Sequence, residues 1–153
     1  MVEIEALKRR IREAFANAKY PGDEAIQDDD DPEEIDSKAF LGHHWRDITE
    51  EAIRANSAAV QFFSPACFAF YLPAYLIFAL DHLHTRDYAT EAAVTCLKPR
   101  KGRPVPNRFQ LLSETQRTAI AAFLVFMRDS VKHMGLNMFA EEALSRYWER
   151  WRT

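Results

Sequence analysis

The sequence predicts a single all-α domain over residues 1–153, a bundle of about five to seven helices around a central apolar helix interrupted by proline. The composition, 48% hydrophobic and 28% charged residues, is typical of one soluble globular domain. Glycine occurs four times in 153 residues, too rarely for the many tight turns of a small β protein. Apolar residues also recur at spacings of three and four, the period of an amphipathic helix.

The first predicted helix spans Val2 to Ala18. Its basic residues lie on the faces away from one apolar stripe, which consists of Ile4, Leu7, Ile11, Ala14, Phe15 and Ala18. The sequence Tyr20-Pro21-Gly22-Asp23 has the composition of a turn and ends this element.

The segment from Asp23 to Asp36 contains nine acidic residues and no Lys or Arg. Its four consecutive aspartates repel one another, so we expect a mobile, exposed acidic loop over residues 22–31. Asp31-Pro32 is typical of a helix start and predicts a short helix that ends near Leu41. The spacing of the acids does not match a calcium-binding EF-hand loop.

A third short helix is predicted to end near Asn56, with Asp47 or Thr49 as its N-cap. The stretch that follows, SPACFAFYLPAYLIFAL at residues 64–80, carries no charge. Ser64-Pro65 has the pattern of a helix start, and Pro73 either kinks the helix or begins a second one that continues to His84.

This apolar stretch is predicted to form the core of the domain. Its uninterrupted apolar part, Pro65 to Leu80, is shorter than the roughly 20 residues needed to cross a bilayer. A proline near its middle also removes a backbone hydrogen bond. We therefore expect no membrane span.

The second half of the chain predicts three helices and one long loop. Residues 88–97 are predicted to be helical, although VTCL within them is also compatible with a strand. KPRKGRPVPNR, residues 98–108, has three prolines, five bases and no acid, and predicts a basic loop. A capping box at Ser113 opens a helix expected to end at Gly135, and a last helix is expected from about Phe139 to Trp151.

Four stretches together resemble a family of small, mostly bacterial proteins with no assigned function. They are REAF followed by YPGD, a tryptophan after a helical segment, SPACFAFYLPAYL, and LSETQRTAIAAFL. YLPAYL, residues 71–76, is the most characteristic part, and the pattern covers roughly residues 10–125. The resemblance implies one intact domain, and it supplies neither an activity nor catalytic residues.

One group of side chains in the sequence has the chemistry of a metal site: His43, His44, Asp81 and His84. Asp81 and His84 are three residues apart and would share a helix face. With His43 or His44 nearby they would form the site of a metal-dependent hydrolase, which is the alternative function. The more ordinary interpretation is a set of polar residues at helix ends.

Tyr71 and Tyr75 lie four residues apart on either side of Pro73. Buried phenol hydroxyls need hydrogen-bond partners, and a proline inside a helix leaves one carbonyl without its donor. We expect both tyrosines in the core, bonded to the carbonyls that Pro73 frees. The alternative is a pocket lined by both rings.

Cys67 and Cys96 lie among apolar residues and predict two buried, free thiols in a cytoplasmic protein. No catalytic serine motif is present. The basic loop contains no aromatic residue and the chain carries a net charge of −3, so nucleic-acid binding is not expected. The sequence leaves the function unknown. It favours a non-enzymatic binding or regulatory module without a cofactor, which associates with a protein partner or with itself.

Overall fold

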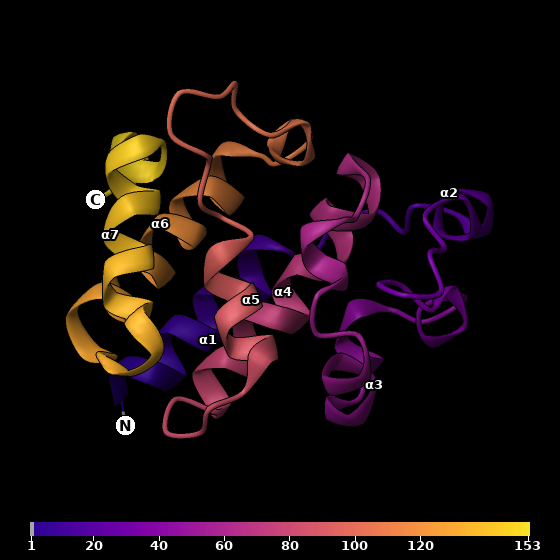
Figure 1. The fold of residues 1–153 in the computed structure, drawn as a ribbon, viewed down its shortest axis with the longest axis horizontal. Helices are drawn as coiled ribbons and strands as arrows, with labels where there is room; N and C mark the ends of the chain where they lie inside the picture. Colours follow the sequence, from indigo (N-terminus) through magenta and orange to yellow (C-terminus); the bar gives the residue numbers. More distant parts are fainter. Residues whose placement is uncertain (1) are drawn as a thin grey trace.

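The computed structural model describes residues 2–153, which form seven α-helices joined by single-turn 3-10 helices (Figure 1). These residues form no strand, and their one isolated β-bridge pairs Asp31 with Ile35. The predicted all-α class and the number of helices are therefore confirmed.

In chain order the α-helices are α1 (Val2–Ala14), α2 (Asp23–Asp28), α3 (Glu50–Ala55), α4 (Pro65–Asp81), α5 (Tyr88–Thr95), α6 (Glu114–Ser130) and α7 (Leu136–Arg146). The 3-10 helices are η1 (Ser37–Ala39), η2 (Trp45–Asp47), η3 (Ala59–Gln61), η4 (Asn107–Phe109), η5 (His133–Gly135) and η6 (Trp148–Trp151).

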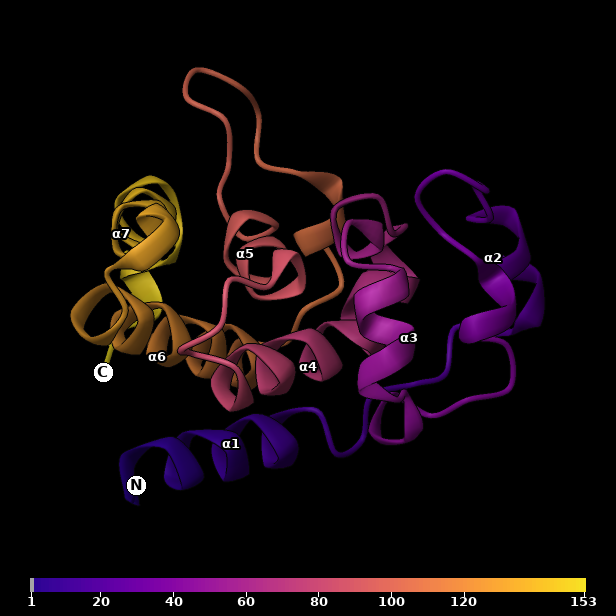
Figure 2. The same cartoon turned by 60° about the horizontal axis from the view of Figure 1, so that its bottom comes forward.

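The helices form layers around α4 and α6. Figure 2 shows α1 on one side of these two helices and α5 and α7 on the other, in agreement with their contacts. The core is continuous from α1 to η6, and twelve of the seventeen residues of α4 are buried in it. The apolar stretch is thus the centre of the fold, as predicted. None of the helices described in residues 2–153 is long and apolar enough to cross a membrane.

Pro73 neither ends α4 nor begins a new helix. One helix of 17 residues runs from Pro65 through Pro73 to Asp81, three residues short of the predicted end at His84. Ser64 takes the N-cap position, but its hydroxyl makes no hydrogen bond. The neighbouring packing on all sides of α4 compensates for the backbone bond that the proline removes.

Tyr71 and Tyr75 are core residues, but their hydrogen-bond partners differ from those predicted. The Tyr71 hydroxyl lies 2.8 Å from the carbonyl oxygen of Phe40 and 2.9 Å from that of His43. The Tyr75 hydroxyl donates to the carbonyl of Asn56 at 2.7 Å. Both rings are fully buried. The hydroxyls therefore attach two preceding loops to α4 and do not bind the carbonyl freed by the proline of their own helix.

Replacing Tyr75 with phenylalanine is expected to lower the free energy of unfolding by about 1 kcal/mol, because the Asn56 carbonyl loses a buried donor. Tyr71→Phe is expected to have an effect of similar size. Chemical denaturation measures both changes. Tyr88→Phe is the matched control, since the Tyr88 side chain is exposed. Equal denaturation midpoints for Tyr75→Phe and the parent would contradict the assignment.

The acidic segment is more ordered than the sequence predicted. The helix α2 occupies most of the expected loop at residues 22–31, and it buries Ile26. The aspartates that follow accept backbone N–H groups: Asp29 Oδ2 from Ser64 at 3.0 Å, and Asp30 Oδ1 from Ser37 at 2.9 Å. Hydrogen bonds to backbone amides thus fix carboxylates that were expected to repel one another into a mobile loop.

The predicted helix from Asp31 to Leu41 is wrong. A tight turn closes where Ile35 N–H donates to the Asp31 carbonyl at 2.6 Å, and the short η1 follows. Ile35 and Phe40 are both buried. On one helix, residues five apart point about 140° away from each other. A continuous helix would therefore expose one of the two side chains.

Helix ends were predicted well where caps are local. Thr49 caps α3, and the Ser113 capping box at the start of α6 is complete. The ends of the outer helices differ: α1 stops at Ala14, and α6 ends at Ser130, five residues before Gly135. Gly135 has a φ of 70° and precedes α7, which begins three residues earlier than expected. The predicted helix over residues 88–97 is confirmed as α5.

Candidate functional site

The structure does not bring the four predicted metal ligands together. The Asp81 carboxylate pairs with Lys8 Nζ at 2.5 Å, and His44 Nδ1 accepts the backbone N–H of Arg46 at 3.1 Å. His43 and His84 lie exposed on the surface. Across residues 2–153, no three His, Cys, Asp or Glu side chains are placed so that they could hold one ion. The hypothesis of a hydrolase that uses these residues has no geometric support.

The two cysteines are buried and form no disulfide. Desolvation raises the pKa of both Cys67 and Cys96 to about 12. At neutral pH both groups are therefore protonated thiols, and the Cys96 Sγ lies 3.4 Å from the Ala93 carbonyl. Such thiols are packing groups, since a nucleophilic cysteine needs a lowered pKa and access to solvent.

The C-terminal aromatic residues form an internal cluster, which we call the aromatic cluster: Phe109, Tyr147, Trp148 and Trp151. Trp148 is 0% exposed, and its indole N–H donates to the Leu97 carbonyl at 2.7 Å. Trp151 donates to the Glu114 carboxylate at 2.7 Å. Trp148 therefore contributes to the domain's own core.

Five large hydrophobic side chains in the described chain are at least 47% exposed: Phe62, Tyr88, Val105, Leu111 and Met138. Phe62 and Tyr88 line two adjoining hollows that share Gln61 and Thr95. Leu111 lines a separate hollow. Apolar surface gathered at one place is typical of a binding site, whereas singly scattered residues are ordinary.

We name this feature the basic groove. Its main pocket, of about 480 Å³, lies between η3, the end of α5, the loop at residues 98–106 and α7. Four cationic side chains line it: Lys98, Arg100, Arg103 and Arg108. The other lining residues are uncharged: Gln61, Phe62, Thr95, Pro104, Pro106 and Phe139. A second hollow of about 220 Å³ shares Gln61 and Thr95 with it and extends to Tyr88.

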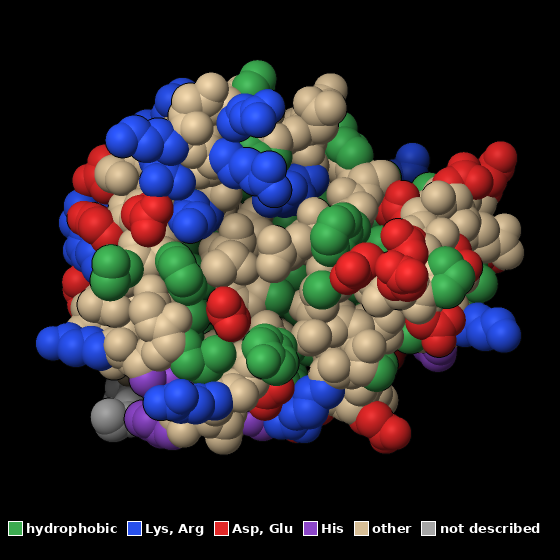
Figure 3. All heavy atoms as spheres, viewed as in Figure 1, with side chains coloured by type: hydrophobic (Ala, Val, Ile, Leu, Met, Phe, Trp, Pro, Cys, Tyr) green, Lys and Arg blue, Asp and Glu red, His purple; other side chains and the backbone are tan. Residues whose placement is uncertain are grey.

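Positive charge in the basic groove is largely uncompensated. Lys98 lies 3.7 Å from Glu142, but the same carboxylate is paired more closely with Arg146, at 2.7 Å. Arg100 and Arg103 form no ion pair with any residue from 2 to 153. Figure 3 shows Lys and Arg side chains crowded over the upper part of this face, with mostly uncharged surface and some acidic side chains below them. The groove thus offers a positive potential beside apolar contact area.

The basic loop is anchored at both ends. At one end Arg146 Nη1 donates to the Pro99 carbonyl at 2.9 Å. At the other, Arg108 donates through Nε and Nη2 to the Cys96 carbonyl, at 3.0 and 2.8 Å. The Arg108 guanidinium also packs over the rings of Phe68 and Phe109, and burial lowers its pKa. The sequence grouped Arg108 with the surface bases, but its guanidinium anchors the end of the loop.

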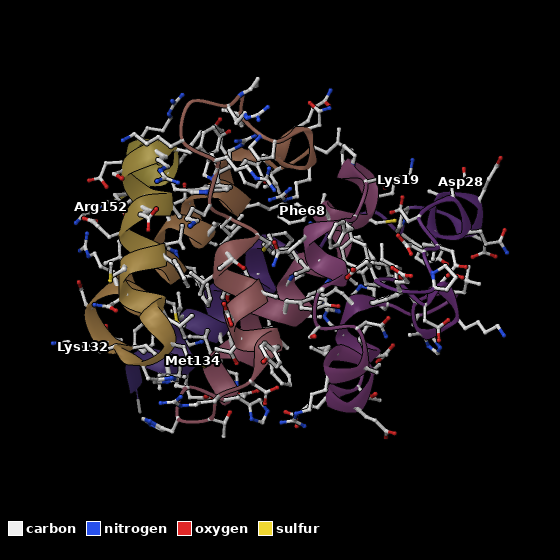
Figure 4. The ribbon with its side chains drawn as sticks, viewed as in Figure 1. Lys19, Asp28, Phe68, Lys132, Met134 and Arg152 are labelled. Carbon is white, nitrogen blue, oxygen red and sulfur yellow. The ribbon has the colours of Figure 1, made fainter. Side chains whose placement is uncertain are left out.

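The acidic segment does not neutralise this loop. No ion pair among the described residues joins residues 23–36 to residues 98–108. Figure 4 shows Phe68 in the centre of the molecule and Asp28 of the acidic segment at one end, across from Arg152 at the other. The two charged regions are therefore separate surfaces.

Comparison with known proteins places the chain in a family. Residues 3–152 match the Family of unknown function (DUF6714). The chain belongs to this family. The DUF6714 match extends beyond the resemblance noted for residues 10–125, and it includes the basic groove and the aromatic cluster. No curated protein and no solved structure matches the chain.

In this DUF6714 chain, sequence reasoning found the basic loop but missed the apolar side of the groove. Phe62, Thr95 and Phe139 come from three separate segments and meet only in the fold. Phe62 and Phe63 are consecutive in the sequence, and only the fold buries Phe63 and leaves Phe62 exposed.

Proposed function

We propose that this protein is a cytoplasmic, non-enzymatic binding module whose basic groove holds an acidic, aromatic-containing segment of a partner protein. The observation that carries the proposal is the position of unpaired Arg100 and Arg103 next to the exposed ring of Phe62. A groove of this kind offers steering by charge and anchoring by an aromatic contact. The two buried cysteines without a disulfide are consistent with a reducing compartment.

A protein segment fits the groove better than a nucleic acid does. The free bases sit on one loop and do not extend over a broad face, and the chain has a net charge of −3. The exposed acidic segment repels a long phosphate backbone. The exposed ring of Phe62 in the groove, in contrast, matches the apolar contacts of a protein interface.

The test uses a labelled random copolymer of glutamate and tyrosine as the probe, followed by fluorescence anisotropy. We expect the copolymer to bind the parent, and Arg100→Glu/Arg103→Glu to weaken binding by at least about tenfold, because two attractive charges become repulsive. Phe62→Ser is expected to weaken it by about tenfold. The matched control is Arg9→Glu/Lys132→Glu, an equal charge change at two exposed residues away from the groove.

Three outcomes would contradict the proposal. The control variant could lose binding as strongly as the groove variant, polyglutamate without tyrosine could bind equally well, or single-stranded DNA could bind more tightly than the copolymer. Sedimentation at micromolar concentration distinguishes self-association from binding to a separate partner protein. A dimer that Arg100→Glu/Arg103→Glu dissociates would place the basic groove in a contact between two copies of the chain.

A further inference from the structure

A second pocket lies between α1, η2, α3 and α4 and shares no residue with the basic groove. Its volume of about 310 Å³ is near the lower end of small-molecule sites. We call it the Trp45 pocket. No sequence feature pointed to it, because its walls come from four separate elements.

The floor of the Trp45 pocket is apolar and fixed. Trp45, Ile53 and Phe78 line it, and each is buried except for 2 or 3% of its surface. The indole N–H of Trp45 donates to the Phe15 carbonyl at 3.3 Å, which holds the ring in place. The apolar side chains that remain half-exposed on this floor are Ile48 and Ile77, so they offer a ligand its preformed apolar contact.

The two carboxylates on the rim, Asp81 and Glu50, lie within ion-pair distance of basic side chains. Asp81 pairs with Lys8, with Nζ and Oδ1 2.5 Å apart. Glu50 Oε2 lies 2.7 Å from His82 Nε2, and its other oxygen lies 3.8 Å from Arg54. Lys8 thus compensates the charge of Asp81, whereas Arg54 lies closer to Asp87, at 3.3 Å, than to Glu50.

The two guanidinium groups on the rim have no hydrogen-bond or ion-pair partner among the described residues. Neither Arg12 nor Arg46 forms an ion pair or a side-chain hydrogen bond with any residue that the structure describes. The Arg46 guanidinium lies over the Trp45 ring, 5.1 Å from its centroid. Two free guanidinium groups at the edge of an aromatic floor are suited to the planar geometry of a carboxylate.

We infer that the Trp45 pocket binds a small organic acid with an apolar or aromatic body. Its carboxylate pairs with Arg12 and Arg46, while its body lies on the half-buried side chains of Ile48 and Ile77, next to the edge of Trp45. An organic cation would meet two like charges, and a neutral apolar molecule would leave both guanidinium groups unused. A free inorganic anion would leave the apolar floor uncovered.

The experiment is an NMR titration of the ¹⁵N-labelled protein with phenylacetate, observing the Trp45 indole N–H resonance, which is assigned with Trp45→Phe. We expect a saturable shift with a Kd on the order of millimolar, the usual range for a ligand of this size. Phenylacetamide, which has the same body without the charge, and phenethylamine, which has the opposite charge, should bind at least about tenfold more weakly.

Arg12→Gln/Arg46→Gln should weaken phenylacetate binding by at least about tenfold while the melting temperature stays close to that of the parent, because neither guanidinium supports the fold. Arg9→Gln/Arg10→Gln removes equal charge from exposed positions of α1 and should leave binding unchanged. Arg100→Glu/Arg103→Glu should also leave it unchanged, so this site and the basic groove are tested independently. The inference is overturned if phenylacetate causes no saturable shift, if phenylacetamide binds as tightly, or if the Arg12→Gln/Arg46→Gln variant binds within twofold of the parent.

Discussion

Replacing Trp148 with alanine is expected to lower the free energy of unfolding by about 4 kcal/mol. Trp148 is completely buried, and its ring centroid lies 4.9 Å from that of Phe109 and 4.8 Å from that of Tyr147. The substitution leaves a cavity at the centre of the aromatic cluster and removes the donor to the Leu97 carbonyl. Urea denaturation followed by circular dichroism measures the loss.

Trp151→Ala is the natural comparison for this variant. Trp151 lies in the same cluster but is only half-buried, so its removal is expected to cost about 1 kcal/mol. If Trp148→Ala is too unstable to purify, Trp148→Phe fills part of the cavity and should still lose about 2 kcal/mol. Equal losses for the Trp148 and Trp151 variants would show that the cluster is not organised around Trp148.

Arg117→Ala is expected to lower the free energy of unfolding by about 3 kcal/mol, the second largest effect. Its guanidinium donates to the Phe109 carbonyl at 2.7 Å, to the Leu112 carbonyl at 3.1 Å and to the Tyr147 hydroxyl. It also lies 5.1 Å from the centroid of the Trp151 ring. One half-buried cation thus joins α6, the end of η4 and the C-terminal turn.

Arg117→Lys keeps the charge but not the three-way donor geometry, so it should recover less than half of the loss. The control for a surface arginine is Arg128→Ala. Arg128 pairs with the exposed carboxylates of Asp129 and Glu141, and its loss should cost less than about 1 kcal/mol. If Arg117→Ala lowers the free energy of unfolding no more than Arg128→Ala does, the anchoring role of Arg117 is contradicted.

Several predictions from local patterns were accurate, although the local helix-start pattern at Asp31-Pro32 was misleading. A capping box needs only Ser113 and Gln116, and the charge-free run around Pro73 indicates burial whatever its neighbours are. The hydrogen bonds of Tyr71 and Tyr75 were not predictable in this way. The residues that accept them lie 19 to 31 positions earlier in the chain, so the fold brings them together.

The acidic segment is a second case in which contacts distant in the sequence decided the structure. Composition predicted a mobile loop, because mutual repulsion is visible in the sequence and the backbone amides that offset it are not. Asp29 finds such an amide at Ser64, 35 residues away. Arg117 was missed for a related reason, since an arginine on an amphipathic helix normally indicates a solvated face. The Trp45 pocket, assembled from four elements, left no local pattern at all.

The position of α1 has a consequence for the synthesis of the protein. Its apolar face packs on α4 and α6, and α6 ends at Ser130. At the usual rate of translation, α6 leaves the ribosome roughly ten seconds after α1. During that interval the part of the α1 apolar face that packs on α6 is uncovered, open to chaperones that bind apolar stretches of nascent chains. The native contacts of α1 are therefore complete only after α6 has been translated.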